Sequence, residues 1–192
     1  MNHYYEKLFE YVGEILIMPE EAKEACRQTF KPIFVPRDTI IEPAGTVPQY
    51  HNFIVSGYMR NFHLDDEGNE ITTDINNSSR FFTSYQHFMN QTVSNENMHC
   101  ITDCELLRIN REDVGSPDTQ SQAQKDYTIK LFQNLLSEEK QRIYDLANLT
   151  AEQRYQKFVK LNPNIIYNVP YYTKAFESLK RRTLIKLCDR SY

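Results

Sequence analysis

The stretch NFIVSGYMRNFHLDDEGNE, residues 52–70, decides the fold because it predicts two β-strands around an acidic turn that contains glycine. The segment DDEGNE is a strong hairpin signal, since Gly68 can adopt the positive φ angle that such a turn requires. We therefore interpret the carboxylates of Asp65, Asp66 and Glu67 as part of a solvated turn rather than as a carboxylate site.

The same pattern of short strands separated by turns extends on both sides of this hairpin, from Lys31 to about Ile109. Short β-branched or aromatic runs alternate with turn residues in KPIFVPRDTIIEPAG, HNFIVSGYMRNFHL, EITTDI and NMHCITDCELLRI. Strands broken by turns every eight to twelve residues indicate a sandwich or barrel of antiparallel strands.

Helices are predicted before this β-rich region, over about residues 3–30. Apolar residues recur there at three- and four-residue spacings, which is the period of an amphipathic helix. Pro19 is suited to open a second helix, with Glu20 and Glu21 in its first turn. We expect the buried face of this second helix to consist of Ala22, Ala25, Cys26 and Phe30.

A long helix is predicted after Ser116–Pro117, from about Thr119 to Ala147. One apolar stripe runs along it and contains Ile129, Phe132, Leu136, Ile143 and Ala147, widened by Leu131 and Leu135. Two arrangements would bury this stripe: packing against the same helix of a partner copy, or folding back onto its own domain. We favour the homodimer.

The segment LTAEQRYQKFVKLNP predicts a further helix. Thr150 and Gln153 have the spacing of a capping box, and Pro163 ends the pattern. The segment NVPYYTKAFESLKRRTLIKLCDR then predicts one or two short helices with a basic face.

Charge is distributed unevenly along the chain. The net charge is −4, yet residues 169–192 carry six basic and two acidic residues, which leaves an acidic body with a basic end. This distribution favours contact between the tail and the phosphates of DNA. The alternative is an ordinary solvated basic helix.

Several classes of protein are disfavoured by the sequence. No apolar run approaches twenty residues and the N-terminus lacks a signal pattern, so we expect a cytoplasmic protein without a membrane partner. The four cysteines form no CxxC pair, which predicts free thiols and neither a metal site nor a cofactor. Phosphate-binding loops, nucleophile elbows, HExxH and dinucleotide fingerprints are absent, so we do not expect an enzyme.

The order of these elements resembles the Crp/Fnr family of bacterial transcription regulators, and most of all its divergent members from Bacteroidetes. FIVSGYMR and DDEGNE resemble its β-roll, DCELLRINRED its last strand, LTAEQRYQKF the first helix of its DNA-binding domain, and NVP the entry to its helix-turn-helix. The resemblance implies an α+β fold. A jelly-roll sensor of the cyclic nucleotide-binding type would span residues 1–116, a dimerisation helix 117–147, and an incomplete, degenerate winged helix-turn-helix 148–192.

Members that bind cyclic nucleotides use a cassette containing Gly-Glu and, about ten residues later, Arg followed by Ser or Thr. Aligned from DCELLRI, these positions fall on Thr83–Ser84 and Ser94–Asn95, and the neighbouring Glu96 would repel a phosphate. We therefore predict that cyclic AMP is not bound in the usual way. Another small-molecule effector could be contacted by Phe82, Thr83, Ser84, Tyr85, Ser94 and Asn95. The alternative is a cavity filled by Phe82, Tyr85, Phe88 and Met89.

Other sensors of the family are not matched. An iron–sulfur cluster would need several cysteines near the N-terminus, where only Cys26 lies, and nothing in the sequence pairs the histidines as haem ligands. His99 and Cys100 are adjacent in a predicted strand, so their side chains should point to opposite faces. We expect core or surface roles for them.

The DNA-binding end departs from the family pattern. In RTLIKLCDR, residues 182–190, Thr183 and Leu184 match the recognition helix, whereas Ile185 and Lys186 replace the usual Ser and Arg. The turn lacks its glycine, and lysine loses bidentate guanine contact. The resemblance implies DNA contacts by Lys180, Arg181, Arg182, Thr183 and Lys186.

Two functions therefore stay open. One is a dimeric transcription regulator, and the other is a ligand- or partner-binding module of the same fold that has lost sequence-specific DNA binding.

Overall fold

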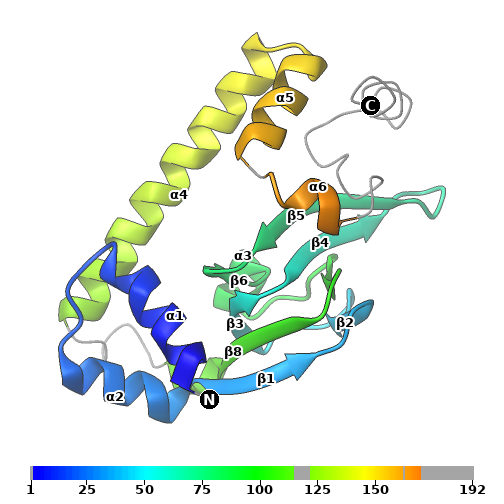
Figure 1. The fold of residues 1–192 in the computed structure, drawn as a ribbon. Coiled ribbons are helices and arrows are strands. Elements are labelled where there is room, and N and C mark those ends of the chain that lie inside the picture. Colours follow the sequence, from blue (N-terminus) through cyan, green and yellow to red (C-terminus); the bar gives the residue numbers. More distant parts are fainter. Residues whose placement is uncertain (1, 115–121, 162, 170–192) are drawn as a thin grey trace. The chain divides into compact units, whose positions relative to one another are not determined.

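A computed structural model describes residues 2–114, 122–161 and 163–169 (Figure 1). The chain divides into two compact units, Met1–Lys130 and Leu131–Tyr192. The predicted contact residues Lys180, Arg181, Arg182, Thr183 and Lys186 lie outside the described residues.

The first unit begins with two helices, α1 (Asn2–Gly13) and α2 (Glu20–Thr29). Pro19 takes the N-cap position of α2, as its sequence predicts, because its fixed φ of −62° suits the start of a helix. The predicted buried face of α2 is wrong at Ala25, which is exposed, while Ala22, Cys26 and Phe30 are half-buried. The helix therefore turns a narrower face to the core than expected.

Two antiparallel sheets of four strands form the β-roll (Figure 1). The strand orders are β1-β8-β3-β6 and β2-β7-β4-β5. The strands are β1 (Lys31–Val35), β2 (Thr39–Glu42), β3 (Tyr50–Ser56), β4 (Tyr58–Leu64), β5 (Glu70–Asn77), β6 (Arg80–Phe82), β7 (Asn97–Cys100) and β8 (Cys104–Asn110). This confirms the predicted antiparallel, α+β architecture.

The stretch at residues 52–70 contains two breaks, where the sequence predicted one. Gly57, with φ +97°, ends β3 and starts β4, which belong to different sheets. Gly68, with φ +80°, lies in the acidic turn between β4 and β5 and confirms that prediction. Asp65 is bound within the turn to Asn69, and these hydrogen bonds lower the pKa of Asp65. Its carboxylate is therefore structural.

Alternating side chains divide the apolar residues into two clusters. The interior of the roll is filled by Val35, Ile54, Met59, Phe82, Met98, Cys100, Cys104 and Leu106. A second cluster lies on the outer face of β3 and β8, beneath α1, and is built on Leu8, Val12, Phe53, Val55 and Leu107. Tyr127, near the start of α4 (Gln122–Asn148), packs against this second cluster.

Helical elements complete the described chain. They are α3 (Tyr85–Asn90), η1 (Arg111–Val114), α4, α5 (Ala151–Leu161) and α6 (Ile165–Asn168). The predicted end of the long helix at Ala147 is one residue from the observed end, while its predicted start lies outside the described residues. The capping box is confirmed: the Gln153 amide donates to Thr150 Oγ1 at 3.2 Å and the Thr150 amide donates to Gln153 Oε1 at 2.9 Å.

In the part of the chain described, none of the helices combines the length and apolar character that crossing a membrane demands.

Candidate functional site

The cassette segment, residues 82–96, connects β6 to β7 and contains the six predicted pocket residues. Ser84 immediately precedes α3, and the backbone of Ser94 is bound to the β2–β3 connection through Thr46 and Gly45, at 2.9 and 2.8 Å. The two ends of the cassette lie next to each other, since Ser94 Oγ donates to Ser84 Oγ at 3.3 Å. The residues at the two aligned positions, ten apart in sequence, are therefore neighbours.

A chain of hydroxyl groups closes the cassette onto Glu96. Ser84 Oγ donates to Glu96 Oε2 at 3.3 Å, and Thr73 Oγ1, from β5, donates to Glu96 Oε1. The amide of Glu96 in turn donates to Ser94 Oγ at 3.1 Å. Ser84 and Ser94 are 8% and 2% exposed, whereas Glu96 and Thr73 are half-buried. Hydrogen bonds among side chains of the cassette and Thr73 of β5 therefore hold the two ends of the cassette together.

This arrangement is unfavourable for a phosphate. Among the described residues Glu96 forms no ion pair with a lysine or arginine, and its carboxylate accepts hydrogen bonds from the hydroxyl groups of Ser84 and Thr73. A second negative charge 4 Å away would be repelled by roughly 4 kcal/mol at the effective dielectric constant of a protein surface. Chemically, the cassette is an acceptor site that suits a hydrogen-bond donor better than an anion.

The structure does not bring the other candidates of the cassette to the same place. Phe82 points into the core of the roll, and Thr83 Oγ1 donates to the carbonyl of Tyr50 at 3.0 Å. Tyr85 and Asn95 are exposed. Phe82 and Phe88 are buried, at 3% and 1% exposed, whereas Tyr85 and Met89 are each 37% exposed.

The sequence did not reveal a row of polar side chains that crosses the interior beside the cassette. In sheet β2-β7-β4-β5, Met98 pairs with Glu42 on one side and with Asn61 on the other. In sheet β1-β8-β3-β6, Asn52 pairs with Arg108 on one side and with Phe82 on the other. The two rows face each other, because Asn52 Nδ2 contacts Met98 Sδ at 3.5 Å. We call the four polar residues, Glu42, Asn52, Asn61 and Arg108, the polar layer.

Hydrogen bonds satisfy only part of the polar layer. Glu42 Oε1 accepts the amides of Gln49 and Tyr50 at 3.0 Å each, and Arg108 Nε donates to Asn52 Oδ1 at 2.9 Å. Three buried atoms of the layer have no hydrogen-bond partner among the described residues: Glu42 Oε2, Asn61 Oδ1 and Arg108 Nη2. Burial raises the pKa of Glu42 and lowers that of Arg108, since both charges lie away from water.

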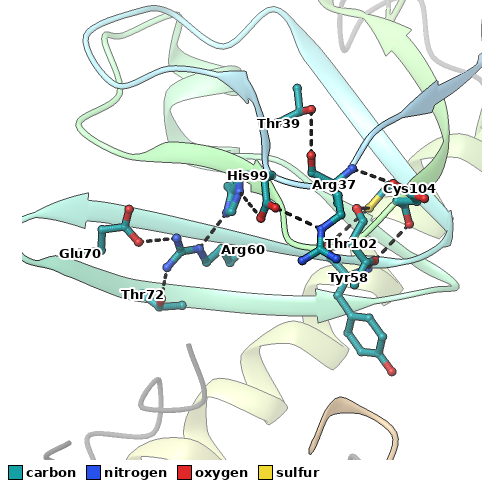
Figure 2. A network of polar contacts seen from close by, with 11 residues as sticks. Arg37, Thr39, Tyr58, Arg60, Glu70, Thr72, His99, Thr102 and Cys104 are labelled. Carbon is teal, nitrogen blue, oxygen red and sulfur yellow. Dashed lines mark hydrogen bonds and ion pairs between the residues drawn. The ribbon is translucent and has the colours of Figure 1, made fainter. Parts of the chain in front are cut away.

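The largest described polar network lies on sheet β2-β7-β4-β5 and centres on Arg60 (Figure 2). Arg60 donates to His99 Nδ1 at 3.0 Å and Thr72 Oγ1 at 3.2 Å, forms an ion pair with Glu70, and stacks 4.3 Å from the Phe62 ring. Burial and the charge of Arg60 lower the pKa of His99. Since these partners lie on β4, β5 and β7, the network fastens three strands together.

His99 and Cys100 diverge as their strand positions predict. His99 faces Arg60, whereas Cys100 belongs to the interior core and is 0% exposed. Cys26, Cys100 and Cys104 are free thiols, and Cys188 lies outside the described residues. Over the described ranges, no three His, Cys, Asp or Glu side chains are grouped as metal ligands would be.

Comparison by sequence gives no relative: no protein-family profile matches the chain, and no curated protein matches it. Solved structures match its fold. A candidate cyclic nucleotide-binding protein from Ruegeria pomeroyi has a TM-score of 0.70 and 16% identity, covering 99% of this chain and 88% of that one. The catabolite activator protein of Thermus thermophilus has a TM-score of 0.55 and 18% identity, and the match covers 91% of this chain and 83% of that one.

A structure of cAMP-bound PfPKA-R (141–441) matches with a TM-score of 0.51 and 15% identity over 59% of this chain, which spans 41% of the length of that one. At such low identities the likeness shows the fold alone. The chain has the α+β jelly-roll fold of cyclic nucleotide-binding domains and of Crp/Fnr-type regulators.

Proposed function

We propose that this chain is a homodimeric, DNA-binding transcription regulator of the Crp/Fnr type, of the divergent kind found in Bacteroidetes, whose β-roll does not take up cyclic AMP in the usual way. The observation that supports it best is the apolar stripe of α4. Ile129, Leu136 and Ile143 are spaced seven residues apart and are 55%, 71% and 65% exposed. Phe132, at 39%, lies on the same stripe.

A seven-residue apolar repeat is the pattern of a helix that packs lengthwise against a second helix. Large aliphatic side chains left this exposed on a soluble chain indicate an interaction surface. Packing the stripe against the same stripe of a second copy would bury both at once. A two-fold dimer would carry two copies of the basic tail, and two-fold symmetric regulators read two half-sites in their operators.

The dimer is tested by changing the stripe while leaving the helix intact. We expect Leu136→Glu and Ile143→Glu, made together, to convert a dimer into a monomer, because two buried carboxylates in an apolar seam cost more than the seam contributes. Light scattering after size-exclusion chromatography measures the mass. Asn134→Glu, at an exposed position on the opposite side of α4, is the matched control and should remain a dimer. A monomeric wild-type protein at 50 µM would refute the dimer.

DNA binding is tested with the promoter region of the chain's own gene, using fluorescence anisotropy at low salt. The basic tail supports the proposal, since six cations within residues 169–192 can neutralise phosphates. Binding that prefers this promoter over a scrambled sequence of equal length is the expected result. No binding even at 20 mM salt would defeat it.

The second function is a ligand- or partner-binding module without sequence-specific DNA reading. Ile185 and the missing glycine of the turn favour it, because the recognition helix has lost part of its usual pattern. Equal affinity for promoter and scrambled DNA would select this function over the first.

The cassette geometry leads to a separate expectation for the sensor. Cyclic AMP should leave the thermal unfolding midpoint unchanged, because the aligned cassette positions carry no cation and Ser84, at one of them, is bonded to the carboxylate of Glu96. A stabilisation of several degrees would contradict the proposed loss of the usual nucleotide site.

A further inference from the structure

We propose that the polar layer of the β-roll, Glu42, Asn52, Asn61 and Arg108, together with the Ser84–Glu96 end of the cassette, binds a small molecule of zero net charge that carries several N–H or O–H donors and at least one oxygen acceptor. The inference rests on the proposed function only in taking the β-roll as the sensor; binding itself is measured without DNA.

The first step is the location of the unpartnered atoms. Four buried side-chain atoms lack a hydrogen-bond partner among the described residues, and three of them belong to the polar layer: Glu42 Oε2, Asn61 Oδ1 and Arg108 Nη2. Glu42 and Asn61 are 8% and 5% exposed, so water outside the protein does not satisfy them. Buried polar groups in native proteins are almost always bonded. Three such atoms in one cross-section of the roll therefore indicate an occupant.

The second step connects this layer to the cassette. Asn61 lies on β4, between β5 and β7. Thr73, which precedes its partner Asp74 on β5, donates a hydrogen bond to Glu96, the residue before β7. The strand pairing places Met98 on one side of Asn61 and Asp74 on the other. The Thr73–Glu96 hydrogen bond therefore links the strands that flank Asn61 to the hydroxyl groups of Ser84 and Ser94. Layer and cassette are thus connected through β5, β4 and β7.

The third step is the chemistry of the occupant. The free groups are one carboxylate oxygen, one amide oxygen and one guanidinium nitrogen. The two oxygens require donors, and the nitrogen requires an acceptor. Glu42 and Arg108 interact electrostatically and their charges cancel, so the layer has no net charge to offset that of a ligand. Glu96 adds a further acceptor and disfavours anions. A free amino acid or a nucleoside has the required character, whereas a cyclic nucleotide or a polyamine does not.

The test uses the purified full-length chain. Thermal shift, followed by isothermal titration calorimetry, is measured with the L-amino acids that have uncharged side chains and the four ribonucleosides as neutral probes, and with cyclic AMP and putrescine as charged probes. We expect at least one neutral probe to raise the unfolding midpoint and both charged probes to leave it unchanged.

The decisive variant is Asn61→Leu, which removes the free amide oxygen while keeping a similar volume. We expect it to fold with an unchanged or higher midpoint, since replacing an unpartnered polar group by an apolar one relieves its desolvation penalty. It should also weaken binding of the active probe at least tenfold. Gln28→Ala is the matched control: it removes an amide from an exposed position on α2, outside the layer and the cassette, and it should bind like the wild type.

Three results would overturn the proposal. The first is that no neutral probe binds and that native mass spectrometry of the purified chain shows no bound small molecule, which would mean that internal water alone completes the layer. The second is binding of cyclic AMP or putrescine in preference to every neutral probe. The third is binding that Asn61→Leu does not weaken. Failure of the promoter experiment changes none of these measurements, so the two proposals fail separately.

Discussion

At the scale of single residues, Gly57 has the most constrained position. Its φ is +97°, and a Cβ there would lie 2.4 Å from the carbonyl of Asp103 and 2.7 Å from Cys104 Sγ. Both the backbone conformation and the space available therefore require glycine at the corner between the two sheets.

We predict that Gly57→Ala lowers the free energy of unfolding by about 2–4 kcal/mol, because strain and a clash with the backbone act together. Chemical denaturation measures it. Gly13→Ala is the matched control, since nothing lies within 4 Å of its Cβ position and alanine favours the helix. Equal stability of Gly57→Ala and wild type would show that the corner can relax.

His51 provides a pH-dependent term. Its ring lies 4.9 Å from that of Phe81 and 5.6 Å from that of Phe88, and burial lowers the pKa of His51 to about 4. A histidine in the unfolded chain titrates near pH 6.5. Between about pH 6.5 and 4 the unfolded state thus binds more protons than the folded state.

The free energy of unfolding should therefore fall as pH is lowered through this window, by about 2 kcal/mol after allowance for partial exposure of the ring. His51→Phe should lose this component, while His87→Gln should retain it. Urea denaturation at pH 7.5, 6 and 5 compares the three proteins. Identical pH dependence in His51→Phe and wild type would exclude His51 as the source.

At the scale of elements, the capping box of α5 is a local device with a measurable contribution. Thr150→Ala removes the acceptor of the Gln153 amide, and we expect it to destabilise the helix by about 1 kcal/mol. Hydrogen exchange of the α5 amides should accelerate by about fivefold, while Gln156→Ala, at an exposed position of the same helix, should leave it unchanged. Unaltered exchange in Thr150→Ala would mean that tertiary contacts alone hold α5.

Features that depend on neighbouring residues, such as turns and helix caps, were predicted well from the sequence. Gly68, Pro19 and the Thr150–Gln153 pair each act on neighbours within four residues, and each is confirmed. The alignment with the family placed Ser84 and Ser94 at its two cassette positions, and these two residues contact each other.

Long-range register was not predictable in the same way. The polar layer depends on Met98 being opposite both Glu42 and Asn61, and β2 reaches that register only through an irregularity between Ile40 and Glu42. A one-residue slip would turn Asn61 to the other face of the sheet. No pattern within a single strand specifies this pairing, so a polar residue in an apolar run could not be assigned to the interior.

At the scale of the whole molecule, the proposed regulator predicts a particular salt dependence. If the tail contacts phosphates, Lys180→Ala and Arg181→Ala should each weaken DNA binding and reduce the slope of log affinity against log salt by about 1. Anisotropy titrations between 20 and 200 mM salt give the slope. Glu177→Gln, in the same segment, should not reduce it. A slope unaffected by both cation removals would place the DNA contacts elsewhere in the chain.

Tyr127 anchors the beginning of α4 in the same apolar cluster that joins α1 to β3 and β8. A helix of 27 residues is about 40 Å long. Tilting its anchored base by only about 5° would displace its far end by roughly 3–4 Å, given that length. If the chain is the regulator proposed above, α4 is therefore the element through which a change involving a few atoms inside the roll is amplified toward the rest of the chain.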